Sequence, residues 1–346
     1  MPDNARFSFL IFTFSSHQKQ QEVTLQSIDV LVLHRIKGVG NVAQLALIKC
    51  YKDNRLNSLE ELLGLVLNQT PTLKRAVKLL QDFFSNNHYL PTKVECENDL
   101  EKWSSAGITV VAYGSGDYPI QLEDLDDPPA LLFCKGNLNL LSSPKSITVV
   151  GTRENTKLGE KIACKTVEYF SHADFCIVSG LALGIDAIAH RAALESDGTT
   201  IAVIVDLVNV SPSNNRDLAE QILKQNGLLV SENPPGTRAV PGLFAKRDRI
   251  QAGLGMAIFA IETSVDGGTM HAVNTANSIK RDVYVPDAVA AGYSNLGVKA
   301  ISGTQSLVSE GKAKPYTRDS YDQISHALKQ LVTSFEAKAN EKASLL

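Results

Sequence analysis

The strongest constraint on the fold of this chain is a regular alternation of short apolar runs with amphipathic runs, which begins at residue 147. The apolar runs are continuous and rich in β-branched residues, which is typical of strands buried on both faces in a parallel sheet. In the amphipathic runs the apolar residues recur at helical spacing, as at Ile185, Ile188, Ala189 and Ala192. The predicted strands are Ile147–Val150, Phe175–Val178, Thr200–Val205, Leu228–Val230, Met256–Glu262 and Asp282–Val285. The predicted helices are Thr156–Phe170, Ile185–Glu195, Leu218–Lys224, Phe244–Leu254 and Thr269–Ile279. This order predicts an α/β fold with a doubly wound, mostly parallel sheet.

The part of the chain that precedes this alternation has a helical period instead. Helical patterning runs from Ser27 to Leu90, with predicted helices at Ser58–Leu67 and Thr72–Phe84, and two strands follow at Ile108–Tyr113 and Leu131–Phe133. We therefore divide the chain into four parts. These are an N-terminal extension (1–22), a small helix-hairpin-helix or SAM-like domain (23–103), the sheet domain (104–312) and a C-terminal tail (313–346) with one helix over Tyr321–Leu346.

A Gly-Val-Gly turn, Gly38-Val39-Gly40, lies between two predicted helices of the N-terminal part. Such a turn resembles a helix-hairpin-helix, in which the backbone amides face a DNA phosphate. The pattern is short and common, and only Lys37 supplies a positive charge beside it. These observations favour a purely structural helical hairpin over a DNA contact.

The composition of the chain limits the kinds of partner that it can bind and indicates the cellular compartment. The net charge is −3, so a nucleic-acid partner requires a local basic patch. The five cysteines form no Cys-x-x-Cys pair and no histidines cluster with them, which predicts no metal site and suits a reducing cytoplasm. The apolar run Phe7–Phe14 is too short to span a bilayer and lacks a clear basic region before it. We therefore expect no membrane association.

Three glycine turns follow predicted strands, where a doubly wound sheet binds its ligands. They are Gly151-Thr152-Arg153, Ser179-Gly180 and Gly267-Gly268-Thr269, and each opens a predicted helix. Backbone amides at a helix start carry partial positive charge, so three such turns at one edge predict an anion site. Arg153 adds a guanidinium, whose planar fork suits phosphate.

A run of cations opens the helix predicted at Phe244–Leu254. Lys246, Arg247 and Arg249 lie within about one helical turn, with Asp248 between them. Such a run of charges usually lies on a solvated helix face, but the position of this run between two glycine turns favours contact with phosphate.

These motifs, taken in order, resemble the DNA-processing protein A family (DprA, also called Smf) over roughly residues 108–308. The resemblance rests on five segments: Gly151-Thr152-Arg153, Ser179–Asp186 with Ala189-His190, Ser231–Gly236, Phe244–Ile250, and Gly267–Ala276. It implies an extended Rossmann fold, preceded by a small helical domain, that binds single-stranded DNA and loads a RecA-type recombinase, typically as a homodimer. It implies neither an enzymatic activity with catalytic residues nor a cofactor.

The resemblance also assigns roles to residues. Arg153, Lys246, Arg247 and Arg249 would form one basic pocket, and Asp186 and His190 would be structural. Backbone or hydroxyl donors would come from Gly151, Thr152, Ser179, Gly180, Gly267, Gly268 and Thr269. The chain departs from the family at Asp248 and Asp266, where family members commonly have Asn and Ser, and both carboxylates add negative charge near the pocket.

Two other functions fit the same scaffold. One is a Lonely Guy-type nucleotide phosphoribohydrolase, which uses a Gly-Gly-x-Gly-Thr turn followed closely by a catalytic glutamate. Here no carboxylate follows Thr269 on the first helical turn, and Glu262 at the preceding strand end fits a loop-bracing role better. The other is a nucleotide-binding sensor that holds a small phosphate ligand in the pocket.

Overall fold

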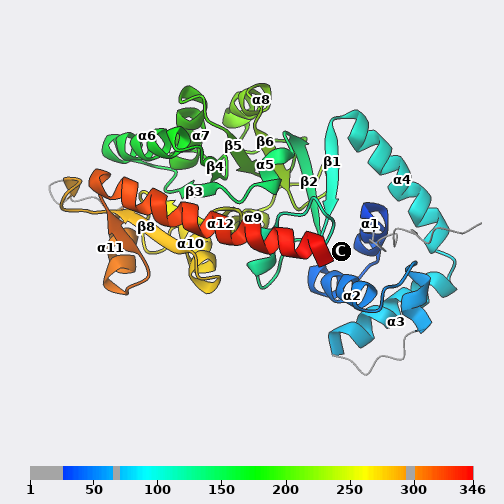
Figure 1. Cartoon of the computed structure of the whole chain (residues 1–346). Helices are drawn as coiled ribbons and strands as arrows, with labels where there is room; N and C mark the ends of the chain where they lie inside the picture. Colours follow the sequence, from blue (N-terminus) through cyan, green and yellow to red (C-terminus); the bar gives the residue numbers. More distant parts are fainter. Residues whose placement is uncertain (1–25, 65–70, 294–300, 346) are drawn as a thin grey trace, which may run out of the picture.

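The computed structural model describes residues 26–64, 71–293 and 301–345, and its centre is a mixed β-sheet (Figure 1). Within these residues the sheet has nine strands in the order β1-β2-β6-β5-β4-β3-β7-β8-β9. The strands from β6 to β9 along this order run parallel, whereas β1 and β2 add an antiparallel edge. The bounds are β1 Ile108–Ala112, β2 Leu131–Gly136, β3 Ser146–Val150, β4 Cys176–Ser179, β5 Thr200–Val203, β6 Leu228–Ser231, β7 Ala257–Ala260, β8 Asp282–Pro286 and β9 Lys314–Tyr316. The predicted fold class is confirmed.

Strand β3 marks the point at which the order of the sheet reverses. The chain moves from β3 to β4, β5 and β6 in one direction, and then returns to place β7 on the other side of β3. The loops after β3 and β7 therefore diverge at the carboxyl edge, which is where open α/β sheets form a crevice.

Helices cover both faces of the sheet. On one face α6 (Lys157–His172), α7 (Ile185–Glu195) and α8 (Arg216–Lys224) pack in sequence, and on the other lie α9 (Pro241–Leu254) and α10 (Thr269–Ser278). The long helix α12 (Tyr321–Leu345) packs beside α6, where the Thr166 hydroxyl lies 2.9 Å from that of Tyr321. None of the helices in the described part of the chain is long and apolar enough to cross a bilayer.

The N-terminal helical part packs against the antiparallel edge of the sheet. It contains α1 (Ser27–Arg35), α2 (Asn41–Asp53), the 3₁₀ helix η1 (Glu60–Gly64), α3 (Pro71–Ser85) and α4 (Tyr89–Ser105). Trp103 stands edge-on to Phe133 of β2, with ring centroids 5.2 Å apart. Asn41 donates to the carbonyl of Pro128 at 2.8 Å and accepts from the N–H of Ala130 at 2.9 Å. One continuous apolar core therefore joins the helices to the sheet.

Several elements differ from their predictions. The helix predicted at Ser58–Leu67 is the short η1, and residues 65–70 lie outside the described chain. Residues 314–316 form edge strand β9, so the sheet continues past the boundary placed at residue 312. Three residues that include a proline carry no period-two signal, which is why this strand was missed. Short elements α5 (Asn139–Ser142), η2 (Ile120–Asp124), η3 (Ser213–Asn215), α11 (Ser302–Ser309) and η6 (Arg318–Ser320) were not predicted. The N-terminal extension 1–22 lies outside the described residues, and the domain boundaries stay predictions.

Candidate functional site

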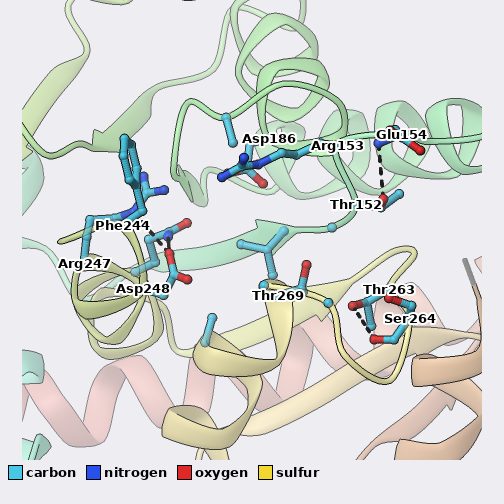
Figure 2. Close-up of a pocket in the computed structure, with 17 residues that line it drawn as sticks. Thr152, Arg153, Glu154, Asp186, Phe244, Arg247, Asp248, Thr263, Ser264 and Thr269 are labelled. Atoms are coloured by element: carbon cyan, nitrogen blue, oxygen red, sulfur yellow. Dashed lines mark hydrogen bonds and ion pairs between the residues drawn. The ribbon is translucent and has the colours of Figure 1, made fainter. Parts of the chain in front are cut away.

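A pocket of about 450 Å³ opens at the carboxyl edge, between the loops that follow β3 and β7 (Figure 2). The turn after β3 supplies Gly151, Thr152 and Arg153, and the turn after β7 supplies Gly267, Gly268 and Thr269. Helix α9 closes a third side with Phe244, Arg247 and Asp248. The structure thus brings two of the three predicted glycine turns into one pocket. A neighbouring pocket of about 350 Å³ includes the third, at Gly180.

Glycine at position 151 lets the loop after β3 lie directly on α7. A Cβ on Gly151 would stand 2.6 Å from Cγ1 of Ile185, the first residue of that helix. The loop is held further by two backbone bonds of Thr152, which donates to Glu262 at 2.7 Å and accepts from Ile185 at 3.1 Å. Arg153 is therefore presented from a fixed turn.

Arg153 is exposed, and within the described chain its side chain has neither a hydrogen-bond nor an ion-pair partner. Figure 2 shows the guanidinium extending across the pocket toward α9. Arg153 and Phe244 line both pockets, so the two form one trough along the sheet edge. An unpaired guanidinium in a trough is free to take an anion.

The start of α10 supplies donors on the facing wall. The N–H groups of Met270 and His271 are taken by the carbonyls of Gly267 and Gly268. The N–H groups of Gly268 and Thr269 find no backbone acceptor in the described part of the chain, and both residues line the pocket. Two free amides at a helix N-terminus suit an anionic oxygen.

Arg247 lines both pockets, but its guanidinium is buried and bonded within the fold instead of pointing freely into the trough. Its Nη1 donates to the carbonyl oxygens of Gly180 and Val203, and its Nε lies 3.2 Å from Oδ1 of Asp248. Only 5% of the residue is exposed. The guanidinium thus ties α9 to the ends of β4 and β5, and lends the pocket its charge from below.

Two carboxyl groups share this buried positive charge. Burial raises the pKa of Asp186 above its ordinary value, and the nearby Arg247 opposes that rise. Burial raises the pKa of Asp248 to about 6, with Arg247 lowering it and Asp186 raising it. Asp248 therefore adds negative charge to the pocket at neutral pH, as its departure from the family suggested. Asp266 is exposed and does not line the pocket.

Lys246 and Arg249 do not reach this pocket. Both face the opposite side of α9, where Lys246 Nζ lies 3.0 Å from Glu232 and Arg249 donates to both oxygens of Glu232 at 2.8 Å. Residues 246 and 249 are three apart, so they share a face of the helix that residues 244, 247 and 248 do not. The expectation of a single basic pocket is corrected on this point.

Other predicted donors are used within the fold. Ser179 Oγ donates to the carbonyl of Val149 at 2.7 Å, and the Gly180 N–H donates to Asp186 at 3.2 Å. His190 is fully buried and bonded to Thr200 at 2.7 Å, and burial lowers its pKa to about 3. Asp186 and His190 thus have the structural surroundings expected of them.

Glu262 braces the loops around the pocket. Its carboxylate accepts from the Thr156 N–H at 2.9 Å and from the Thr156 hydroxyl at 2.6 Å, and the residue is completely buried. Thr156 in turn caps α6 by accepting from the Gly159 N–H at 3.0 Å. These bonds hold the carboxylate away from the pocket lining.

The described residues contain no group of three or more His, Cys, Asp or Glu side chains placed to hold a metal ion.

Phe244 lines the site but was not predicted as a site residue, although it belongs to one of the segments that resemble the family. It is half-buried where the two pockets meet. Its position three residues before Arg247, on the same helix face, is the signal that could have identified it.

Most of the sheet-containing part of the chain is similar to known proteins. Residues 109–329 match the family described as DNA recombination-mediator protein A. The DNA processing protein DprA of Bacillus subtilis is 33% identical over 204 residues, covering 58% of this chain and 68% of that protein. The DprA of Streptococcus pneumoniae is 38% identical over 196 residues, with 56% and 66% covered. Protein Smf of Synechocystis is 39% identical over 172 residues, with 49% and 43% covered.

Solved structures show the same architecture. The X-ray structure of DprA from Streptococcus pneumoniae superposes with a TM-score of 0.67 at 27% identity, covering 85% of this chain and 95% of that one. A Helicobacter pylori DprA structure, described for its single-stranded DNA binding mode, gives a TM-score of 0.56 at 24% identity, with 64% and 96% covered.

Proposed function

Because this chain belongs to the DNA recombination-mediator protein A family, we propose that it binds single-stranded DNA in the trough at the carboxyl edge of its sheet. The observation that carries this proposal is the exposed, unpaired guanidinium of Arg153, which lines both halves of the trough. In a protein with a net charge of −3, a local cation must hold the phosphate backbone.

Each wall of the trough has a distinct task in this proposal. Arg153 pairs with a phosphate, and the free amides of Gly268 and Thr269 donate to the same or the next phosphate. Phe244 offers a ring on which a base stacks, a contact that tolerates any sequence. Arg247 acts from beneath as a buried charge that attracts the strand without contacting it directly.

The cellular role follows the family. We propose that the protein protects single-stranded DNA and loads a RecA-type recombinase onto it, in recombination or natural transformation in the cytoplasm. We also propose that it works as a homodimer, which sedimentation at about tens of micromolar would detect. Formation of recombinase filaments on oligo-dT, with and without the protein, measures the loading step.

We propose a binding role and no catalytic one. Glu262, the carboxylate at the end of β7 that a catalytic role would require, is buried and bonded to Thr156, which suits a brace and not a catalytic group. A nucleotide-binding sensor would use the same Arg153 and α10 amides, so only its ligand differs.

One experiment separates these functions. The purified protein is titrated into fluorescent oligo-dT, and separately incubated with nucleotides and nucleoside monophosphates. Saturable strand binding supports the proposal. Release of a free base would identify a phosphoribohydrolase, and saturable nucleotide binding without strand binding would identify a sensor.

A further inference from the structure

We propose that the turn between α1 and α2, together with Lys246 of α9, forms a second binding site for the same DNA strand, with a pocket for one nucleobase. This inference rests on the proposed function. It concerns the opposite side of α9 from the trough, where the helical part meets the sheet.

The site is a pocket of about 160 Å³. One wall is the α1–α2 hairpin, with His34, Gly40 and Gln44, and the other is formed by Glu232 and Lys246 from the sheet part. The hairpin is fixed in place because the Asn41 side chain bonds to the loop at Pro128 and Ala130. Residues about 200 positions apart in the sequence thus line one small cavity.

Lys246 supplies the positive charge that the hairpin turn lacks in sequence. Arg249, which also lies 3.7 Å from Asp127, pairs with both oxygens of Glu232 at 2.8 Å, so Glu232 keeps a partner for each oxygen when Lys246 turns away. The Lys246 side chain is 43% exposed and touches the same carboxylate at 3.0 Å. Its ammonium can therefore turn to a phosphate at little cost. A second exposed cation, Lys37, directly precedes the Gly38-Val39-Gly40 turn.

The start of α2 offers backbone donors beside this charge. The first hydrogen bond of this 13-residue helix runs from the Gln44 N–H to the Gly40 carbonyl at 3.0 Å, so the amides of residues 41–43 have no acceptor within the helix. No side chain caps them, because the N-cap residue is Gly40, and the side chain of Asn41 is turned toward the neighbouring loop. The positive end of the helix dipole therefore faces outward.

Gln44 indicates that more than a phosphate enters the pocket. The residue is only 3% exposed, and its Nε2 donates to the Val39 carbonyl at 2.9 Å while its Oε1 has no partner. A buried amide oxygen without a donor is costly, and a phosphodiester has no N–H to offer. A nucleobase does, through a ring N–H or an exocyclic amino group. Burial lowers the pKa of His34, so this neighbour is a neutral ring, and its Nδ1 lies 3.4 Å from Gln44 Nε2 and offers nothing to Oε1.

The two sites lie on opposite faces of one helix. Helix α9 presents Phe244 and Arg247 to the trough and Lys246 to the small pocket. A strand that crosses α9 therefore reaches both sites, whereas a very short oligonucleotide occupies the trough alone.

Oligonucleotide length is the readout that tests this second site. Binding of oligo-dT of about 4 and about 16 nucleotides, the span of known single-strand site sizes, is measured by fluorescence anisotropy. We expect Lys246→Ala and Gln44→Leu each to weaken binding of the long oligonucleotide by about three- to ten-fold and to leave binding of the short one unchanged. Lys246→Ala should also make the salt slope shallower by about 0.7.

The matched control is Lys312→Ala, because the Lys312 side chain is 51% exposed and pairs with Glu310 at 2.7 Å in the turn before β9, the edge strand opposite β1. This variant should bind both the short and the long oligonucleotide like the parent. Suppose that folded Lys246→Ala and Gln44→Leu bind the long strand like the parent, while Arg153→Ala binds it more weakly. This result overturns the proposal of a second site and leaves the proposed binding in the trough intact. An Arg153→Ala variant that binds both lengths like the parent overturns the proposed function itself.

Discussion

Arg247 donates through Nη1 to the carbonyl oxygen of Gly180, and its guanidinium fills the space that a Cβ on residue 180 would need. The same nitrogen also donates to the carbonyl of Val203. One buried side chain therefore fixes α9 against the ends of two strands of the sheet.

Arg247→Ala should lower the free energy of unfolding by about 3–5 kcal/mol, the usual cost of removing one member of a buried ion pair. It leaves two buried carbonyls without this donor and removes the ion pair of Asp248. Chemical denaturation measures the loss. Arg191→Ala, an exposed arginine on α7, should stay within about 0.5 kcal/mol of the parent. Parent-like stability of Arg247→Ala would show that its bonds contribute little.

Arg153→Ala should weaken oligo-dT binding by about 1–3 kcal/mol, because hydrogen bonds to a charged group are lost. The slope of log affinity against log salt should become shallower by about 0.7. Because Arg153 is exposed and unpaired, stability should not change. Titrations at several salt concentrations test this, with Arg191→Ala as the control that keeps the parent's slope.

Phe244→Leu should weaken oligo-dT binding by about 1–3 kcal/mol while leaving the salt slope unchanged, because stacking releases no counterions. Leucine keeps much of the apolar packing of this half-buried position. The contrast with Arg153→Ala separates base contacts from phosphate contacts. A shallower slope in Phe244→Leu would contradict this division.

Binding should tighten as the pH falls from about 7.5 to about 5.5, through the pKa of Asp248 at about 6. A bound phosphate disfavours the charged carboxylate and raises that pKa further, so binding takes up a proton. Asp248→Asn should bind more tightly than the parent at neutral pH and flatten the pH profile, since the amide still accepts the bond from Gln251. Anisotropy titrations across this range provide the measurement, and a parent that binds equally at both ends would exclude Asp248 as the titrating group.

The architecture of the sheet followed from the sequence because its central parallel strands β3 to β7 are buried on both faces and so appear as continuous apolar runs, whereas the exposed edge strand β9 does not. The glycine turns were predicted for a related reason. The carboxyl ends of parallel strands meet at one edge, so Gly151 and Gly267 had to lie near one another.

The partners of the three cations Lys246, Arg247 and Arg249 could not be predicted in the same way. A Lys-Arg-Asp-Arg run has the same appearance whether its guanidinium groups meet solvent or buried carbonyls. The acceptors of Arg247 lie 67 and 44 residues away, and the partner of Arg249 lies 17 residues away. Only the packing of α9 decides which side each cation faces.

The contact of Trp103 with Phe133 belongs to an apolar core that runs without interruption from the helical part into the sheet. Two regions that share a core have no separate melting temperatures, because exposing one removes the other's packing. Heating should therefore give one calorimetric transition in which the van't Hoff and calorimetric enthalpies agree, despite a chain whose sequence changes period near Trp103.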